Sequence, residues 1–197
     1  MPRRSFDVLD LPNLLTLSRI AAAPVLVWLL ADPTPLRSGL ACALFFVACL
    51  SDWLDGELAR RRGTVSNVGK FLDPLADKVL VLSVLIMLCA TPGAPRAPAW
   101  IVALLTAREV GVTTLRAIAS DEGLVIGAEA LGKAKMIFEI VALVPLLAHY
   151  RLGPLDFHAA GLVFLWYATA LALWSGTTYL VRLAKVLRAR PAGVHEV

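Results

Sequence analysis

The sequence predicts an all-α integral membrane protein with six transmembrane helices, and three observations support this fold class. Of the 197 residues, 58% are hydrophobic and only 17% are charged. The mean hydropathy of +0.74 is too high for a soluble domain of this size. Several apolar runs are long enough, at about 20 residues, to cross the hydrocarbon core of a bilayer, and the charges cluster between them.

A single membrane domain over residues 1–197 accounts for this length. Segment 1–12 carries Arg3 and Arg4 among apolar side chains, and we expect it to lie along the membrane surface as a short interfacial lead-in. Together with the apolar run that follows, this start could pass for a signal peptide. Arg19 in the middle of that run argues against this alternative.

The first expected span, residues 13–31, carries one polar stripe with a three-residue spacing, formed by Asn13, Thr16 and Arg19. As structural alternatives, Asn13 could cap the helix and Thr16 could bond its own backbone. For Arg19 we expect a phosphate or carboxylate partner, because a charge inside a span is usually functional. The stripe is therefore a candidate lipid or phosphate contact.

Five further spans follow, separated by segments rich in proline, glycine or charge. Their expected ranges are 36–60, 73–90, 99–119, 132–148 and 159–183. Residues 184–197 are expected to form a basic cytoplasmic tail. With six spans, both termini lie on one side, which holds most of the Lys and Arg residues. The opposite side holds only Arg37, Arg96 and Arg151, so the positive-inside rule places both termini in the cytoplasm.

Four carboxylates lie where the second and third spans meet a short basic turn: Asp52, Asp55, Asp73 and Asp77. The first pair is spaced i, i+3 and the second i, i+4, so each pair falls on one helix face. Small residues and one arginine share these faces: Gly56, Ala59, Arg60 and Gly69. Two helices can therefore face each other with four carboxylates between them.

Carboxylates at membrane depth are costly and usually functional. Four of them so close together would repel one another unless cations lay among them. Oxygen ligands without Cys or His favour Mg²⁺, Mn²⁺ or Ca²⁺ over zinc, so we expect a divalent-cation site for phosphate chemistry. Asp73 before Pro74 also has the pattern of a helix N-cap, a role it could have as well.

The full pattern over residues 52–77, D-x2-D-G-x2-A-R-x8-G-x3-D-x3-D, resembles the signature of the CDP-alcohol phosphotransferases. These are integral membrane enzymes that move a phosphatidyl or related group from a CDP-linked donor to an alcohol and release CMP. The resemblance implies a pair of Mg²⁺ or Mn²⁺ ions held by Asp52, Asp55 and Asp73, with Asp77 beside them as a ligand and as the general base. It also implies a homodimer and a set of CDP contacts: Asp52, Gly56, Ala59, Arg60 and Gly69.

Three further segments resemble the phosphatidylglycerophosphate synthase branch of this family: LPNLLTLSRI at 11–20, TAREVGVTTLR at 106–116 and GKAK at 132–135. The acceptor of that branch is sn-glycerol 3-phosphate, an anion that needs a cationic pocket. The candidate acceptor-phosphate ligands are Arg108, Arg116, Lys133 and Lys135. Glu109 could instead pair with Arg108 or Arg116 and neutralise it.

The GKAK segment departs from the branch pattern at two positions that bear on the acceptor. Met136 and Glu139 stand where the branch usually has Thr and Gln. The expected reaction is phosphatidyl transfer from CDP-diacylglycerol to sn-glycerol 3-phosphate, giving phosphatidylglycerol phosphate and CMP. We expect it at the cytoplasmic face of a bacterial inner membrane, with membrane lipid as a partner and no nucleic acid.

Other functions stay open at this point. The same chemistry could use serine, an inositol derivative, or phosphatidylglycerol, as in a cardiolipin synthase. A divalent-cation transporter is a more remote alternative, and it predicts acidic residues spread across the bilayer rather than gathered on one side. A protein that binds a nucleotide-lipid without turning it over is a third alternative, disfavoured by the presence of all four Asp residues.

Overall fold

The computed structural model describes residues 11–62, 67–91, 96–121, 130–149, 151–152 and 154–189. Within these ranges, the side chains of 11–16, 52–62, 67–74 and 130–133, and of a few residues at element ends, are outside the description. The helices are α1 (Leu11–Ala31), α2 (Pro35–Arg62), α3 (Asn67–Cys89), α4 (Ala99–Asp121), α5 (Ala130–Ala148) and α6 (Phe157–Ala189). Two-residue strands β1 (Arg151–Leu152) and β2 (Leu155–Asp156) pair as an antiparallel hairpin between α5 and α6. The predicted all-α class is confirmed, with the hairpin as a small addition.

Helix α3 begins earlier than expected, and this changes the interpretation of Asp73. The helix starts at Asn67 rather than at Asp73, so Asp73 and Pro74 lie inside it and Asp73 does not cap its start. Ser66, directly before the helix, is a residue type favoured at helix N-caps, which gives the earlier start a sequence basis. Helix α6 likewise continues past the expected end at Leu183 to Ala189.

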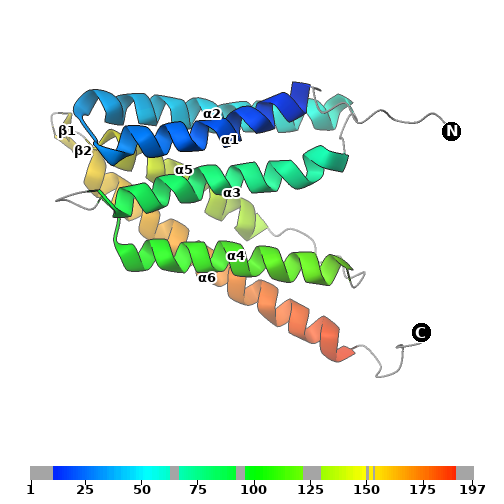
Figure 1. The fold of residues 1–197 in the computed structure, drawn as a ribbon. Coiled ribbons are helices and arrows are strands. Elements are labelled where there is room, and N and C mark those ends of the chain that lie inside the picture. Colours follow the sequence, from blue (N-terminus) through cyan, green and yellow to red (C-terminus); the bar gives the residue numbers. More distant parts are fainter. Residues whose placement is uncertain are drawn as a thin grey trace.

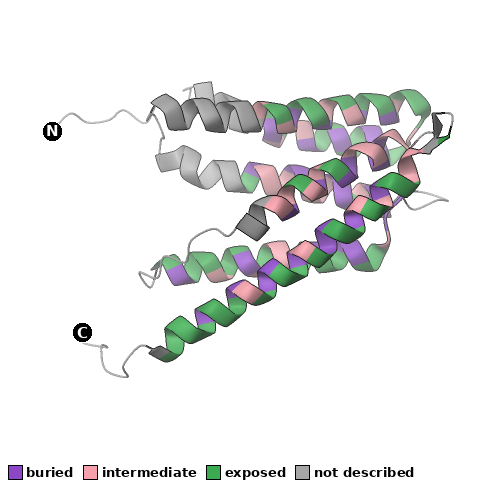
Figure 2. Ribbon diagram, turned by 180° about the vertical axis from the view of Figure 1, so that it is seen from behind, coloured by how far each residue is buried: buried purple, intermediate pink, exposed green. Residues whose placement is uncertain are grey.

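The helices form a bundle in which α1 packs against α2 and α3, and α5 packs against α6 (Figure 1). Helix α2 also contacts α5, and α3 contacts both α4 and α5. Buried leucines and Phe45 fill the interior, while the outward faces of the helices are exposed (Figure 2). The start of α1, the junction of α2 with α3, and the end of α6 all lie at one end of the bundle, called the motif end below (Figure 1).

Helices α5 and α6 approach each other closely at Gly161. A Cβ atom added there would lie 2.7 Å from Leu146 Cγ and 3.1 Å from the Ala142 carbonyl oxygen. Leu146 is fully buried, so it has little room to move. Glycine at this position therefore lets the two helices lie against each other.

The outer surface carries many large apolar side chains. Trp28, Leu36 and Trp174 are each more than 60% exposed, at 63%, 73% and 66%. Exposed apolar surface on this scale is typical of lipid-facing helices. Among the described residues one helix, Phe157–Arg188, is long and apolar enough to cross a membrane, and Leu17–Ala31 and Pro35–Ser51 are shorter apolar helices. The exposed apolar side chains and the long apolar helix indicate a membrane protein.

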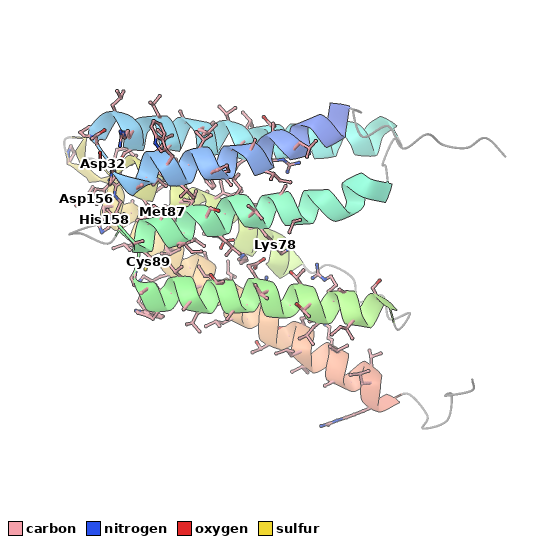
Figure 3. All side chains as sticks on the ribbon, viewed as in Figure 1. Asp32, Lys78, Met87, Cys89, Asp156 and His158 are labelled. Carbon is pink, nitrogen blue, oxygen red and sulfur yellow. The ribbon has the colours of Figure 1, made fainter. Side chains whose placement is uncertain are left out.

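The end of the bundle opposite the motif has its own buried polar cluster. Arg96, only 6% exposed, donates through its two Nη atoms to the Leu147 carbonyl oxygen at 3.0 Å and to Ser38 Oγ at 3.1 Å. The rings of His149 and His158 meet edge to face, with centroids 4.8 Å apart. Figure 3 places His158 at this end, far from Lys78 on the part of α3 nearer the motif end.

Candidate active site

The backbone brings all eight fixed positions of the aspartate motif to one end of the bundle. Five of them lie in the last turns of α2, and three lie in the first turns of α3. The α2 positions are Asp52, Asp55, Gly56, Ala59 and Arg60, and the α3 positions are Gly69, Asp73 and Asp77. Only a four-residue connection separates Arg62 from Asn67, so the two helix ends are neighbours (Figure 1).

Of these motif side chains, the structure describes only that of Asp77. It is partly buried, it is engaged with other groups, and its neighbour Ala76 is fully buried. Among the described side chains, no group of three or more His, Cys, Asp or Glu residues is placed to hold a metal ion. The other three carboxylates lie outside that set, so the predicted four-carboxylate arrangement stays a prediction.

A second group of candidates lies in the polar stripe of α1. Arg19 is buried, at 4% exposed, although it sits in an apolar helix, and it has a polar or electrostatic partner. The expected phosphate or carboxylate partner of Arg19 stays a prediction. Asn13 and Thr16 lie in the first turns of α1, and their side chains are outside the described residues.

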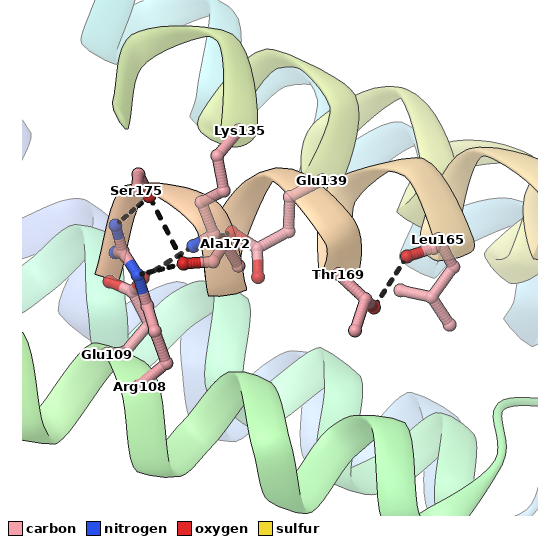
Figure 4. A network of polar contacts seen from close by, with 8 residues as sticks. All are labelled: Arg108, Glu109, Lys135, Glu139, Leu165, Thr169, Ala172 and Ser175. Atoms are coloured by element: carbon pink, nitrogen blue, oxygen red, sulfur yellow. Dashed lines mark hydrogen bonds and ion pairs between the residues drawn. The ribbon is translucent and has the colours of Figure 1, made fainter. Parts of the chain in front are cut away.

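A network of buried charges joins α4, α5 and α6 (Figure 4). Arg108 Nη1 donates to Glu109 Oε1 at 2.6 Å, and Lys135 Nζ donates to the same oxygen at 2.6 Å. Lys135 Nζ also lies 2.5 Å from Glu139 Oε2, one turn further along α5. Two cations and two carboxylates therefore alternate in one chain with no net charge.

Arg108 also ties α4 to α6. Its Nε donates to the Ala172 carbonyl oxygen at 3.2 Å, and its Nη2 donates to Ser175 Oγ at 2.6 Å. With the bond to Glu109, all three nitrogens of this guanidinium are engaged. Ser175 gave no signal in the sequence, because one serine in a long apolar helix usually bonds only its own backbone. It does donate to Ala172 in this way, in addition to accepting from Arg108.

The four predicted phosphate-binding cations are therefore in three different situations. Arg108 and Lys135 belong to the charge-balanced network, and the expected pairing of Glu109 with Arg108 is confirmed. Arg116 is exposed, and its guanidinium lies over the ring of Tyr179, with Cζ 5.6 Å from the centroid. Lys133 lies in the first turn of α5, and its side chain is outside the described residues.

The network lies next to the motif. Helices α3 and α5 are in contact, and the carboxylates of Asp77 and Glu139 are close enough to repel each other. Glu139 is buried, at 3% exposed, and its Oε1 has no hydrogen-bond partner among the described residues. In the sequence Glu139 is notable only as a departure from the branch pattern, because its burial near Asp77 depends on how α5 is rotated against α3.

Comparison with known proteins agrees with the signature. Residues 9–174 match the family model for CDP-alcohol phosphatidyltransferase. The chain is 36% identical to the CDP-diacylglycerol–glycerol-3-phosphate 3-phosphatidyltransferase of Bacillus subtilis, over 91% of this chain and 97% of that protein. It is 34% identical to the protein of the same name from Rickettsia bellii, over 86% and 93%. It is also 33% identical to the CMP-forming cardiolipin synthase of Streptomyces coelicolor, over 92% and 86%.

Proposed function

The chain belongs to the CDP-alcohol phosphatidyltransferase family, and from that membership we propose that it transfers a phosphatidyl group from CDP-diacylglycerol to sn-glycerol 3-phosphate. The products are phosphatidylglycerol phosphate and CMP. The observation that carries the proposal is the placement of the whole aspartate motif on two adjoining helix ends, beside a buried network of charged residues. A cation transporter would instead need carboxylates along a path through the bundle.

The residues present fit a divalent-cation site. The donors at the motif positions are hard carboxylate oxygens on adjacent helix ends, the ligand type that Mg²⁺ and Mn²⁺ prefer. Asp52, Asp55 and Asp73, with Asp77 beside them, would hold the ions, and we propose a pair. When bound, such ions neutralise negative charge on a diphosphate and on departing CMP.

The remaining motif residues would bind the donor. Gly56, Ala59 and Gly69 have little or no side chain, so cytidine can approach the helix backbones closely. Arg60, one helix turn from Gly56, would contact a donor phosphate. In the α1 stripe, buried Arg19 would bind a phosphate or a carboxylate at the same end of the bundle.

Asp77 would act as the general base. The acceptor hydroxyl oxygen forms a bond to the phosphorus of the phosphatidyl group, the bond from that phosphorus to CMP breaks, and the hydroxyl proton moves to Asp77. CMP leaves with the electron pair of the broken bond. Asp77 suits this role because it is a partly buried carboxylate at the motif, near the charged network of α4 and α5.

The acceptor phosphate would be bound mainly by Arg116 and Lys133, the two candidate cations that are not among the described members of the network. Arg116 is exposed near the motif end of α4, and Lys133 opens α5. Arg108 and Lys135 would contribute only if the phosphate replaced a carboxylate partner, because each already bonds Glu109. Phosphatidylglycerol is the alternative acceptor, because a cardiolipin synthase is among the similar proteins.

We further propose that all six helices cross the membrane. Each has at least 19 residues, close to the length of about 20 that a bilayer requires. The basic residues at the motif end support a cytoplasmic position for that end. The proposed location is the inner membrane of a bacterium, and the relatives from Bacillus subtilis and Rickettsia bellii support a bacterial source. A homodimer is the assembly implied by the family resemblance.

The experiment that tests the function is CMP release by the purified full-length protein in detergent. It receives CDP-diacylglycerol, Mg²⁺ or Mn²⁺, and one acceptor at a time: glycerol 3-phosphate, serine, inositol phosphate or phosphatidylglycerol. We expect release with glycerol 3-phosphate alone, and a loss of about 100-fold or more in kcat for Asp77→Asn. The matched control is Asp32→Asn, which changes an exposed carboxylate that pairs with Arg37 at the opposite end of the bundle.

Each result of this assay is decisive for one part of the proposal. Release with another acceptor only would replace glycerol 3-phosphate by that alcohol. Full activity of Asp77→Asn would overturn the assignment of the base. Absence of release with every acceptor would contradict phosphatidyl transfer itself.

A further inference from the structure

Glu139 has one carboxylate oxygen that the protein leaves without a donor. Its Oε2 is bound to Lys135 Nζ at 2.5 Å, whereas Oε1 has no hydrogen-bond partner among the described residues. The residue is only 3% exposed, so bulk water does not satisfy this oxygen. Buried carboxylate oxygens are almost always hydrogen-bonded, so this one calls for a partner such as a bound water, an ion or a group of the substrate.

The chemistry around Glu139 indicates what kind of group binds at Oε1. A cation there would lie close to the Lys135 ammonium, which is already fixed between Glu109 and Glu139. A phosphate or a carboxylate would be repelled by Glu139 itself. A neutral donor such as an alcohol hydroxyl meets neither obstacle.

The position of this oxygen indicates which hydroxyl binds. Glu139 lies close enough to Asp77 for their carboxylates to repel each other, across the contact between α5 and α3. Asp77 is the proposed base, so it receives the hydroxyl that attacks. The inference places a second hydroxyl, on the neighbouring carbon of the acceptor, against Glu139.

We propose that Glu139 is a specificity residue that accepts a hydrogen bond from the second hydroxyl of the acceptor, so that the site selects a vicinal diol. The inference rests on the proposed function and deepens it. Lys135 is a positioning residue in this scheme, because its bond to Oε2 leaves Oε1 as the oxygen without a donor. An acceptor with one hydroxyl leaves Oε1 buried and unpaired, and it is disfavoured for that reason.

The test compares two acceptors that differ only in that hydroxyl: sn-glycerol 3-phosphate and 3-hydroxypropyl phosphate. The measured quantity is the ratio of their kcat/KM values in CMP release with CDP-diacylglycerol and Mg²⁺. For the wild-type protein we expect glycerol 3-phosphate to be preferred by about tenfold or more, as befits a hydrogen bond to a charged group. In Glu139→Met the ratio is expected to fall close to one, because the apolar side chain accepts no hydrogen bond.

The control variant is Glu109→Gln, which alters the other carboxylate bound to Lys135. If Glu109→Gln disturbs the network, it should lower kcat/KM for both acceptors by the same factor. The ratio of the two kcat/KM values should then stay at its wild-type value. A purely structural role of Glu139 predicts the same parallel loss in Glu139→Met, and that result would overturn the inference. So would a wild-type protein that uses both acceptors equally well.

A second variant covers the case in which Glu139→Met does not fold. Glu139→Gln keeps the shape of the side chain, but its one acceptor oxygen is taken by Lys135, and an amide N–H₂ then faces the substrate. This N–H₂ group can donate to the oxygen of the second hydroxyl, so we expect the ratio to stay near its wild-type value in this variant, and a ratio close to one would contradict the inference. Absence of CMP release by the wild-type protein with either acceptor would instead refute the proposed function, so the two failures are distinguishable.

Discussion

Two buried polar clusters at opposite ends of one bundle are built on different principles. At the motif end, Lys135 and Arg108 are balanced by carboxylates, and one oxygen of Glu139 is left without a donor. At the other end, Arg96 donates to a backbone carbonyl oxygen and to Ser38. Here the described hydrogen bonds of a buried cation go to neutral acceptors, and they join the end of α5 to the start of α2. At the motif end, we propose that a substrate hydroxyl supplies the missing bond to Glu139.

The largest effect that this comparison predicts is the loss of stability in Lys135→Met. Glu139 would keep a buried charge without its cation, and breaking a buried ion pair in this way costs about 3–5 kcal/mol. The double variant Lys135→Met with Glu139→Met removes both charges, and it should recover most of that loss. Thermal unfolding of both proteins in the same detergent checks this. If the double variant is as unstable as the single one, the ion pair is not what stabilises the network.

An intermediate effect is expected for Arg96→Met, which sharpens the contrast between the two ends. The variant loses the hydrogen bonds to Leu147 and Ser38, and about 1–3 kcal/mol of unfolding free energy should go with them. The kcat and KM of the folded protein should stay near their wild-type values, because this cluster is remote from the motif. The checks are the unfolding midpoint and the rate of CMP release per folded molecule. A marked change in KM would show that the far cluster takes part in the reaction.

The smallest effect concerns pH and involves His149 at the far end. Burial, then Arg96 and His158, hold the pKa of His149 below its ordinary value, and Asp156 opposes them. The unfolded chain therefore binds a proton at His149 more readily than the folded protein does. The contribution of neutral His149 to the free energy of unfolding is complete above the ordinary pKa of histidine, and it is lost as the pH falls through the lower pKa of the folded protein. The midpoint of unfolding should drop between pH 7.5 and pH 5 by less in His149→Asn than in the wild-type protein.

Asparagine is the suitable replacement at this position because His149 has a φ of 52°, in the left-handed region that asparagine tolerates. Equal pH dependence in the two proteins would show that His149 does not contribute to it. Activity measured at pH 7.5 should be the same for both, which separates this far-end effect from the chemistry at the motif end.

Sequence reasoning predicted the helices well because long apolar runs and their breaks are local signals. It placed the end of α1 at Ala31 and the start of α4 at Ala99, as observed. It placed the start of α3 too late, because Asp73-Pro74 has the pattern of a helix start although the helix already runs from Asn67. The signal for the family was equally local, since all eight fixed positions fall within one stretch of 26 residues.

The polar contacts between helices could not be predicted in the same way. Whether Lys135 meets Glu109, and whether Arg108 reaches Ser175, depends on the rotation and depth of three separate helices. Arg96 lies between helices, as its proline-rich surroundings predict, but the sequence does not indicate that its side chain is buried or that its backbone N–H donates to the Leu88 carbonyl oxygen. The local sequence does not predict how helices pack against one another or which path a short connection takes.

Helix α6 is long enough to carry basic residues beyond the hydrocarbon core, where they can interact with anionic lipid head groups. Its 33 residues extend about 50 Å, whereas the hydrocarbon core is about 30 Å thick, so the last turns stand outside the core. Lys185 and Arg188 are exposed on those turns, and each basic residue near an anionic leaflet gains about 1 kcal/mol of attraction. The proposed donor and the proposed product are both anionic lipids, so the substrate and product of the reaction belong to the class of lipid that attracts this helix end.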